Sequence, residues 1–521
     1  MGWNDWAHYQ CEYTAQTILT NARALVKTGL AARGYKTVTI DDCWMQKDRD
    51  SQGNLQADPQ RFPQGMKALA NAIHSMGLKF GIYEDSGYAT CGGFAGSGVP
   101  NGGGKAHFSQ DARLFASWGV DYLKLDGCNV YIPPGSNKVK ARHKAYSAES
   151  AALKATGRPI VFSESATDCC RFDPYYYDVL SWVGQYGQLW RIGNDVATFR
   201  ASHPDRPRFH SVLWNYAVNL QLGRFQKPGN WDDPDFVIGG DSGLSLAETR
   251  SQMALWSMMS SPLNLSSNIG KLSSEAIAIL GNKQVIAIDQ DPLGKMATLV
   301  RRTPVMDVLF KRLDGDEYAV AVLNHGSSTI QVKLHPVEFG FSTNKACRLR
   351  ARNLWSGTHS YSSLLSANVA SHDTEIWQMR ASSSCGVPTR TGAIVMVVPP
   401  GKHWRQKHPN ERHPGIQEYG RCLAAPGHVG ACTGAAAERW TVTPEGLLKS
   451  GEHCLAVING KVVMQSCSTG STEHWKYNLA GNLIDSGGQC LSTSDDKDRV
   501  QSLSIQTCGH NPPNQIWSLP N

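Results

Sequence analysis

Residues 119–128 read GVDYLKLDGC, and this stretch decides the fold of the first half of the chain. Gly119 is predicted to end a helix, because glycine takes the left-handed conformation of a helix end without steric cost. Residues 121–125 are typical of a buried strand, and Asp126 closes that strand. This ten-residue unit therefore combines a helix end, a strand and a carboxylate.

The same unit of helix, glycine, strand and acidic residue recurs along the first 240 residues. Amphipathic spacing and glycine stops predict helices over 14–33, 63–76, 109–118 and 145–155, with strands over 37–40, 79–83, 121–125 and 160–163. Ser109 is predicted to cap the third of these helices. The apolar face of the first helix is predicted to hold Ile18, Ala22, Leu25, Val26 and Leu30.

Each predicted strand is followed by an acidic side chain. Intervals of 44, 41, 38, 31 and 40 residues separate these positions, which are Asp41, Asp85, Asp126, Glu164, Asp195 and Asp235. Strands and helices that alternate at this spacing predict a parallel sheet. Acids at one end of every strand favour a (β/α)8 TIM barrel over an open doubly wound sheet, because the barrel gathers its active site at that end.

The pattern changes after about residue 289, where short β-rich segments such as 308–311, 318–323 and 329–334 follow one another without a long helix. This pattern predicts an antiparallel β-sandwich, within or across which Cys347 and Cys385 pair. The predicted organisation is multidomain: a catalytic barrel over 1–288, a sandwich over 289–396, a basic Pro- and His-rich linker over 397–412 and a β-trefoil over 413–521.

The last hundred residues repeat one pattern three times: a Cys-Leu pair, a second cysteine, and an acid or amide two residues before a tryptophan. The three copies are Cys422-Leu423, Cys432 and Glu438-x-Trp440; Cys454-Leu455, Cys467 and Glu473-x-Trp475; and Cys490-Leu491, Cys508 and Gln515-x-Trp517. Units this small must share a core, so we expect the tryptophans to fill it and each unit to hold one disulfide. The repeat resembles the ricin-type β-trefoil, a sugar-binding module. Such modules usually carry an aspartate after the Cys-Leu pair, where this chain has Ala424, Ala456 and Ser492, so sugar binding by the trefoil stays open.

Bulk properties exclude several classes of protein. The formal charge is +7, with 41% apolar and 18% charged residues and no apolar run long enough to cross a membrane, so neither nucleic acid nor a membrane is expected as a partner. The chain opens directly in motif-like sequence at Met1, so we expect that a targeting segment has been removed. Fourteen cysteines without zinc-site spacing favour disulfides and a secreted, extracellular protein. Asn264-Leu265-Ser266 is the N-glycosylation sequon of this predicted glycoprotein, although its place near the eighth strand works against modification.

A barrel mouth crowded with carboxylates suits hydrolysis of a glycosidic bond, which needs two carboxyl groups. Six motifs occur in order: 1–6 MGWNDW, 40–44 IDDCW, 81–85 GIYED, 124–128 KLDGC, Trp190-Arg191 with Asp195, and 231–235 WDDPD. Together they resemble the α-galactosidases of glycoside hydrolase family 27, and 289–294 DQDPLG resembles that family's passage out of the barrel. The added trefoil is similar to certain fungal secreted members.

The resemblance implies a retaining enzyme that needs no metal or cofactor. It makes Asp126 the nucleophile and Asp195 the acid/base, with the two carboxyl groups about 5–5.5 Å apart and the pKa of Asp195 raised by burial or by nearby carboxylates. The substrate-holding residues it implies are Trp6, Asp41, Asp42, Tyr83, Lys124, Glu164, Arg191 and Asp235. Structural alternatives are a buried Lys124–Asp126 pair, a helix-capping Asp195 and a packing role for Trp6; Trp3 and Trp44 fit either a site or a core.

The resemblance also implies disulfides Cys11–Cys43 and Cys91–Cys128. The family often has cysteine directly before the glutamate of the fifth strand, whereas Ser163 precedes Glu164 here. This departure leaves the state of Cys169 and Cys170 open.

The predicted function is therefore removal of terminal α-galactose from oligosaccharides and galactomannan-type polymers. An α-N-acetylgalactosaminidase or a β-L-arabinopyranosidase would share the scaffold, and the intact Asp41-Asp42 pair favours galactose over arabinose. A non-catalytic carbohydrate-binding protein is the alternative of a different class. Linkage preference, pH optimum and oligomeric state do not follow from the sequence.

Overall fold

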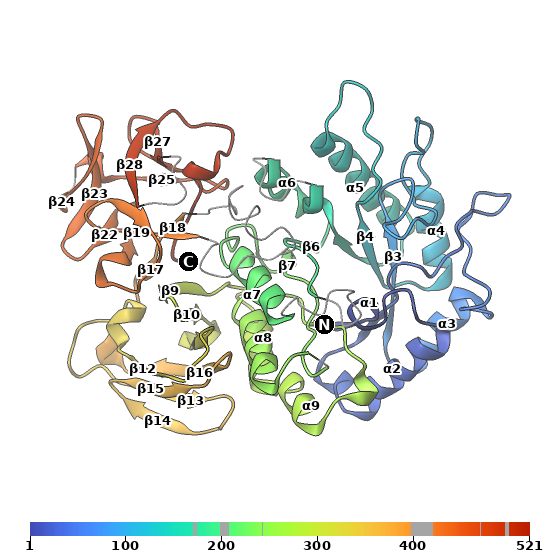
Figure 1. Cartoon of the computed structure of the whole chain (residues 1–521), viewed down its shortest axis with the longest axis horizontal. Coiled ribbons are helices and arrows are strands. Elements are labelled where there is room, and N and C mark those ends of the chain that lie inside the picture. Colours follow the sequence, from blue (N-terminus) through green and yellow to red (C-terminus); the bar gives the residue numbers. More distant parts are fainter. Residues whose placement is uncertain (170–174, 198–207, 242, 397–419, 469, 495–499) are drawn as a thin grey trace. The chain divides into compact units, whose positions relative to one another are not determined.

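The computed structural model describes residues 1–169, 175–197, 208–241, 243–396, 420–468, 470–494 and 500–521 (Figure 1). The chain divides into two compact units, and each is described by itself. The first contains residues 1–215, 229–249 and 261–283, and the second contains the remainder.

The first unit holds eight parallel strands in the order β7-β6-β5-β4-β3-β2-β1-β8. Val237, shortly after β7, forms a parallel bridge to Leu265 in β8 and so closes the sheet on itself. The predicted TIM barrel is confirmed. Its strands are β1 Gly2–Asn4, β2 Thr37–Thr39, β3 Lys79–Asp85, β4 Tyr122–Asp126, β5 Val161–Glu164, β6 Leu189–Arg191, β7 Trp231–Asp233 and β8 Asn264–Leu265.

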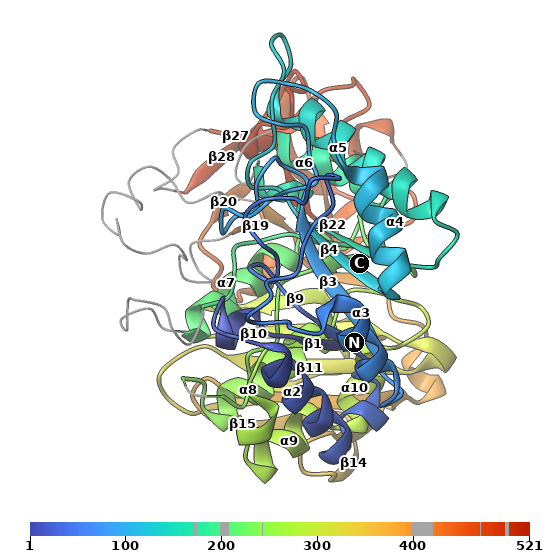
Figure 2. The same ribbon diagram turned by 90° about the vertical axis from the view of Figure 1, so that its right-hand side faces the viewer.

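Helices follow the strands, as the repeating sequence unit predicted, and Figures 1 and 2 show α3, α4 and α5 on the outer side of β3 and β4. The helices are α1 Trp6–Tyr9, α2 Ala15–Lys27, α3 Gly65–His74, α4 Phe108–Trp118, α5 Lys138–Ala155, α6 Tyr175–Val183, α7 Arg208–Asn219, α8 Leu246–Met258, α9 Ser274–Leu280 and α10 Lys283–Asp289. Among the described helices, none is long and apolar enough to span a membrane.

Three helix predictions were wrong in detail. Helix α2 ends at Lys27 rather than near residue 33, and Val26 is 47% exposed because it lies beside the buried stripe of Ile18, Ala22 and Leu25. Helix α4 begins at Phe108, so Ser109 lies inside it and is not its cap. Helix α5 begins seven residues before the predicted start, where the Asn137 side chain accepts a hydrogen bond from the Lys140 N–H, because its first turns carry too many polar residues to show an apolar period.

Antiparallel strands form the sandwich, which confirms the change of pattern after residue 289. One sheet has the order β14-β13-β16-β11-β10-β9 and the other pairs β12 with β15. A disulfide joins Cys347 to Cys385 within this domain. The strands are β9 Thr298–Arg302, β10 Met306–Arg312, β11 Tyr318–Asn324, β12 Ile330–Leu334, β13 Leu349–Asn353, β14 His359–Ser362, β15 Leu365–Val369 and β16 Thr374–Ala381.

The remaining strands build the trefoil. Strands β17 and β18, which the sequence places at the end of the sandwich, pair instead with the trefoil strands β21, β19 and β29. The set is β17 Arg390–Ala393, β18 Val395–Met396, β19 Arg421–Ala424, β20 His428–Gly430, β21 Arg439–Val442, β22 Leu448–Ser450, β23 His453–Ile458, β24 Lys461–Ser466, β25 Lys476–Tyr477, β26 Leu483–Ile484, β27 Cys490–Thr493, β28 Gln501–Gln506 and β29 Trp517–Ser518.

The three trefoil tryptophans fill the shared core, as predicted. Each indole N–H donates to the carbonyl oxygen of the leucine in the Cys-Leu pair of its own repeat, at 2.8–3.0 Å; the pairs are Trp440 with Leu423, Trp475 with Leu455 and Trp517 with Leu491. One disulfide closes each repeat: Cys422–Cys432, Cys454–Cys467 and Cys490–Cys508. Each unit is therefore fixed internally by an equivalent hydrogen bond and disulfide, and the three units share one apolar core.

Candidate active site

The carboxylate that ends β4 is the centre of the candidate site. Asp126 is partly buried and accepts hydrogen bonds from the Gly127 N–H at 2.9 Å and from the Tyr83 hydroxyl at 3.2 Å. Burial, followed by the charge of Asp126, raises the pKa of Tyr83 well above its ordinary range, so the phenol keeps the proton that it donates. The β4 nucleophile candidate is thus oriented by two donors.

Lys124 lies two residues earlier on the same strand and therefore on the same side of it. Its ammonium group is 2.7 Å from Asp41 Oδ2 and 5.1 Å and 5.3 Å from the ring centroids of Tyr83 and Phe236. Burial lowers the pKa of Lys124, but the charges of Asp41 and Asp126 outweigh it and the net change is upward. The ammonium group stays charged beside both carboxylates, in a largely buried position.

Asp41 and Asp42, which follow β2, are both buried. Asp41 Oδ2 also accepts from the Asn4 amide at 2.7 Å, and the Asp41 N–H donates to Asp5. Asp42 accepts from the Cys43 and Gly92 N–H groups, each at 2.7 Å. Burial raises the pKa of Asp42.

A second cation, Arg191 at the end of β6, bridges the other two predicted acids. Its guanidinium is 3.0 Å from Asp195 Oδ1 and 3.1 Å from Asp235 Oδ1. Asp235 is buried, with φ at +78°, and accepts from the Val196 N–H at 2.6 Å. Burial raises the pKa of Asp235 to about 7, against the charge of Arg191.

The Asp195 side chain is 66% exposed. The expectation that burial tunes this residue is therefore wrong, because its carboxyl lies in water. The other expected source of tuning was a nearby carboxylate, and Asp235, held by the same arginine, is such a neighbour.

Glu164 ends β5 and is fully buried. Among the described residues, neither of its carboxylate oxygens has a hydrogen-bond partner. Burial raises the pKa of Glu164 well above its ordinary range. A buried carboxyl group without protein partners lowers the stability of the fold. Such a cost is expected where the group binds a ligand.

The tryptophans of the motifs divide into two groups. Trp6 is partly exposed at the start of α1, whereas Trp3 and Trp44 are fully buried and donate to the carbonyl oxygens of Ser267 and Tyr83. Trp3 and Trp44 therefore belong to the core.

Two disulfides lie beside the strand ends, Cys11–Cys43 and Cys91–Cys128, and both are pairs that the resemblance implied. The sulfurs of Cys91 and Cys128 are bonded to each other and so offer no thiolate to a metal near Asp85 and Asp126. The side chains of Cys169 and Cys170 lie outside the described residues.

Several contacts at this end of the barrel were missed from the sequence. Asn4 and Asp5 lie within the first quoted motif, yet nothing in the motif shows that they hold Asp41. Phe236 follows Asp235 directly, and its ring lies against the Lys124 ammonium group. Only the fold brings these residues from β1, β4 and the segment after β7 to one place.

A parallel barrel that gathers two cations and several buried carboxyl groups at its C-terminal mouth is a glycoside hydrolase scaffold. The comparisons with known proteins agree. The alpha galactosidase A family matches residues 1–291, the alpha galactosidase C-terminal beta sandwich domain matches 304–379, and the ricin-type beta-trefoil lectin domain matches 415–517.

Similar proteins cover the whole chain. It is 35% identical to the probable alpha-galactosidase A of Aspergillus clavatus and 33% identical to alpha-galactosidase A of Aspergillus niger, over 100% of this chain and 93% and 91% of theirs. The structure of the Saccharomyces cerevisiae alpha-galactosidase with raffinose is 25% identical, with a TM-score of 0.63 over 73% of this chain and 97% of that one. The chain belongs to the alpha galactosidase A family and is a glycoside hydrolase.

Proposed function

We propose that this protein is a retaining α-galactosidase that removes terminal α-D-galactosyl residues by double displacement, with Asp126 as nucleophile and Asp195 as acid/base. The observation that carries the proposal is the environment of Asp126. Its carboxylate is oriented by the Gly127 N–H and the Tyr83 hydroxyl, lies two residues from the charged Lys124, and is still partly exposed.

In the first step, an Asp126 oxygen attacks the anomeric carbon while Asp195 gives its proton to the leaving oxygen. A covalent β-galactosyl-enzyme forms and the leaving alcohol departs. In the second step, Asp195 takes a proton from water, whose oxygen attacks the same carbon and releases Asp126. Two inversions return the α-configuration.

The exposure of Asp195 supports a large and variable leaving group. An acid at the solvent-facing rim can protonate the oxygen that joins galactose to a chain, while the rest of that chain stays in water. The raffinose complex of the yeast relative fits the same class of substrate. We therefore include oligosaccharides and galactomannan-type polymers among the substrates.

Selectivity for galactose is assigned to buried charged groups. Asp41, Asp42 and Glu164 are suited to bind sugar hydroxyls, and a sugar that lacks a matching hydroxyl would leave a buried carboxylate unpaired. Arg191 and Asp235 form the wall next to Asp195, and Trp6 offers an apolar face to the ring. We also propose that the protein works outside the cell, because the described residues hold six disulfides.

Two assays on the full chain test the proposal. Nitrophenol release is measured with the α-galactoside, the α-N-acetylgalactosaminide and the β-L-arabinopyranoside; preference for the first is expected, and preference for either of the others would overturn the galactose assignment. An activated fluorinated galactoside, whose fluorine slows hydrolysis of the covalent intermediate, is then expected to add one fluorogalactosyl mass to the peptide that contains Asp126. Labelling of a different carboxylate would overturn the nucleophile assignment.

A further inference from the structure

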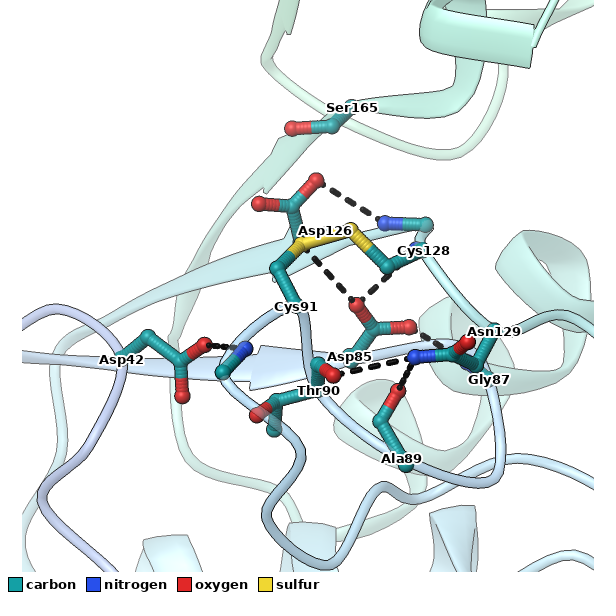
Figure 3. Close-up of a disulfide and its surroundings, with 12 residues drawn as sticks. Asp42, Asp85, Gly87, Ala89, Thr90, Cys91, Asp126, Cys128, Asn129 and Ser165 are labelled. Carbon is teal, nitrogen blue, oxygen red and sulfur yellow. Dashed lines mark hydrogen bonds between the residues drawn. A yellow bond between two sulfur atoms is a disulfide. The ribbon is translucent and has the colours of Figure 1, made fainter.

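A second carboxyl group stands directly beside Asp126. Asp85 ends β3 and is the register partner of Asp126 across the parallel β3–β4 pair. It is fully buried, yet it accepts two backbone hydrogen bonds: one from the Gly87 N–H at 2.7 Å and one from the Cys128 N–H at 3.0 Å. One donor belongs to the loop after β3 and the other to the loop after the nucleophile (Figure 3).

We infer that Asp85 is a positioning residue for the nucleophile: its carboxyl group fastens the loop after β3 to the loop after β4 and thereby fixes the direction of the Asp126 side chain. The inference rests on the proposed function, since it takes Asp126 to be the nucleophile. Nothing in the sequence motifs assigns Asp85 a role beyond its place at a strand end.

Further hydrogen bonds and a disulfide join the same two loops. The Ser86 N–H donates to the Asp126 carbonyl at 2.9 Å, and the Tyr88 N–H donates to the Asn129 carbonyl at 3.1 Å. The Asn129 side-chain amide donates to the carbonyl oxygens of Ala89 and Thr90, both at 3.0 Å (Figure 3). The Cys91–Cys128 disulfide closes the same pair of loops.

Glycines at two positions allow close packing around this backbone. A Cβ atom on Gly87 would lie 2.3 Å from the Asn129 carbonyl carbon, and a Cβ atom on Gly127 would lie 2.4 Å from the Arg142 guanidinium. The loop after β3 is therefore packed against the backbone of the loop after β4, and the residue after Asp126 is packed against α5.

Helix α5 fixes the opposite side of the same backbone. Arg142 donates to the Gly127 and Ser165 carbonyl oxygens, and the Tyr146 hydroxyl donates to the Leu125 carbonyl at 3.3 Å. Asp85 is the carboxyl tie on the β3 side, and it holds the nucleophile loop through the Cys128 N–H, two residues after Asp126. Without it, the loop keeps its α5 contacts and its other bonds to the loop after β3, and it loses the bond closest to the Asp126 side chain on that side.

The charges around Asp85 agree with this role. The titratable groups that face it are Asp126 on β4, Tyr83 and Glu84 on β3, and Arg142 and Tyr146 on α5. Burial and then the charge of Asp126 raise the pKa of Asp85 to about 8. The buried Asp85 carboxyl group therefore holds a proton more readily than a free aspartate does.

The test compares Asp85→Asn with a matched control at the neighbouring strand β4. An asparagine offers only one acceptor oxygen, so its amide N–H groups oppose one of the two backbone donors. Asp121 precedes β4 at the other end of the barrel, where it accepts from the Phe80 N–H at 2.9 Å and pairs with Arg158. Asp121→Asn therefore breaks a similar strand-to-strand tie far from the chemistry.

We expect Asp85→Asn to lower kcat about 10²-fold, with KM changed less than about threefold. The rate constant for labelling by the fluorinated galactoside should fall by the same factor as kcat, because that step uses Asp126 alone. Asp121→Asn should lose thermal stability and keep wild-type kcat. A kcat for Asp85→Asn within about threefold of wild type, or an equal loss of kcat in Asp121→Asn, would overturn the inference.

A second variant keeps the inference testable if Asp85→Asn does not fold. Asn129 is partly exposed, so Asn129→Ser is expected to fold, and the change removes the bonds to Ala89 and Thr90. Its kcat should fall about tenfold with KM little changed. An unchanged kcat would count against the inference. Wild-type protein that is labelled on a carboxylate other than Asp126 would instead overturn the proposed function.

Discussion

The barrel mouth and the trefoil both carry acidic side chains in motifs, but the fold uses them in opposite ways. Glu164 in the barrel is buried, and neither carboxylate oxygen has a hydrogen-bond partner among the described residues. Glu438 in the trefoil accepts from the Thr433 N–H and hydroxyl and from the Gly434 N–H, at 2.8–3.0 Å. Glu164 can therefore bond to a ligand, whereas the carboxylate of Glu438 already accepts hydrogen bonds from its own loop.

The other trefoil repeats show the same internal use. Glu473 accepts from the Ser468 N–H and hydroxyl, and Gln515 bonds to the Gly509 N–H and to the Ser492 hydroxyl. The positions after the Cys-Leu pairs, Ala424, Ala456 and Ser492, are buried. A repeated acid or amide before tryptophan therefore indicates trefoil architecture, whereas an acid at a barrel strand end indicates chemistry.

The largest effect that would sharpen this contrast is expected at Asp126. Asp126→Asn keeps one of the two hydrogen bonds that the carboxylate accepts and removes the nucleophile, so kcat should fall about 10⁴-fold or more. Stopped assays on the nitrophenyl α-galactoside measure it, with circular dichroism to show that the fold is intact. Activity within tenfold of wild type would place the nucleophile elsewhere.

A smaller loss is expected at Glu164. Glu164→Gln should lower kcat/KM about 10- to 10²-fold, because the amide replaces one of the two oxygens that can bond to sugar hydroxyls by an NH2 group. The same change should leave the thermal midpoint unchanged or higher, since no contact within the described protein is broken. A variant that is both fully active and less stable would show Glu164 to be structural.

The opposite result, a loss of stability without a loss of activity, is expected for Glu438→Ala. It leaves three loop donors without a partner and should lower the free energy of unfolding by about 1–3 kcal/mol. Its kcat/KM should equal that of the wild type. Calorimetry and the nitrophenyl assay, run on the same preparation, measure the two quantities. Loss of activity without loss of stability would contradict a purely architectural role.

The smallest effect concerns Glu149, a buried acid on α5 whose carboxylate oxygens also have no partner among the described residues. Burial and then the charge of Asp111 raise its pKa well above the ordinary value of 4.5. Its folded form therefore binds the proton more tightly than the unfolded form, and the stability this gives is full below pH 4.5 and declines as pH rises toward the raised pKa.

Glu149→Gln should flatten the fall of the thermal midpoint as the pH rises above 4.5 toward the raised pKa of Glu149. Glu452→Gln, at an exposed position, is the control and should leave the slope unchanged. Equal slopes in wild type and Glu149→Gln would show that Glu149 does not titrate in this range.

Much of this architecture could be predicted from the sequence. Glycine stops, β-rich runs and strand-terminal acids determine the barrel, because helix and strand periods differ and parallel strands bring their ends together. The Cys-Leu and tryptophan repeats predicted the trefoil core because each unit is too small to bury its own apolar surface.

Finer features depended on the fold. The role inferred for Asp85 rests on backbone N–H groups of Gly87 and Cys128, and a sequence does not show where loops place their amides. The exposure of Asp195 does not follow from its place in the motif, and the missed tie from Asn4 to Asp41 joins neighbouring strands 37 residues apart.

The central claim, that Asp126 attacks the sugar and Asp195 transfers the proton, is tested most directly by azide rescue of Asp126→Gly and Asp195→Gly. Azide that replaces the nucleophile attacks the substrate once, so Asp126→Gly should yield β-galactosyl azide. Azide that replaces water attacks the galactosyl-enzyme, so Asp195→Gly should yield α-galactosyl azide. Proton NMR of the products distinguishes the anomers. The reverse assignment, or the α-azide from both variants, would contradict the account.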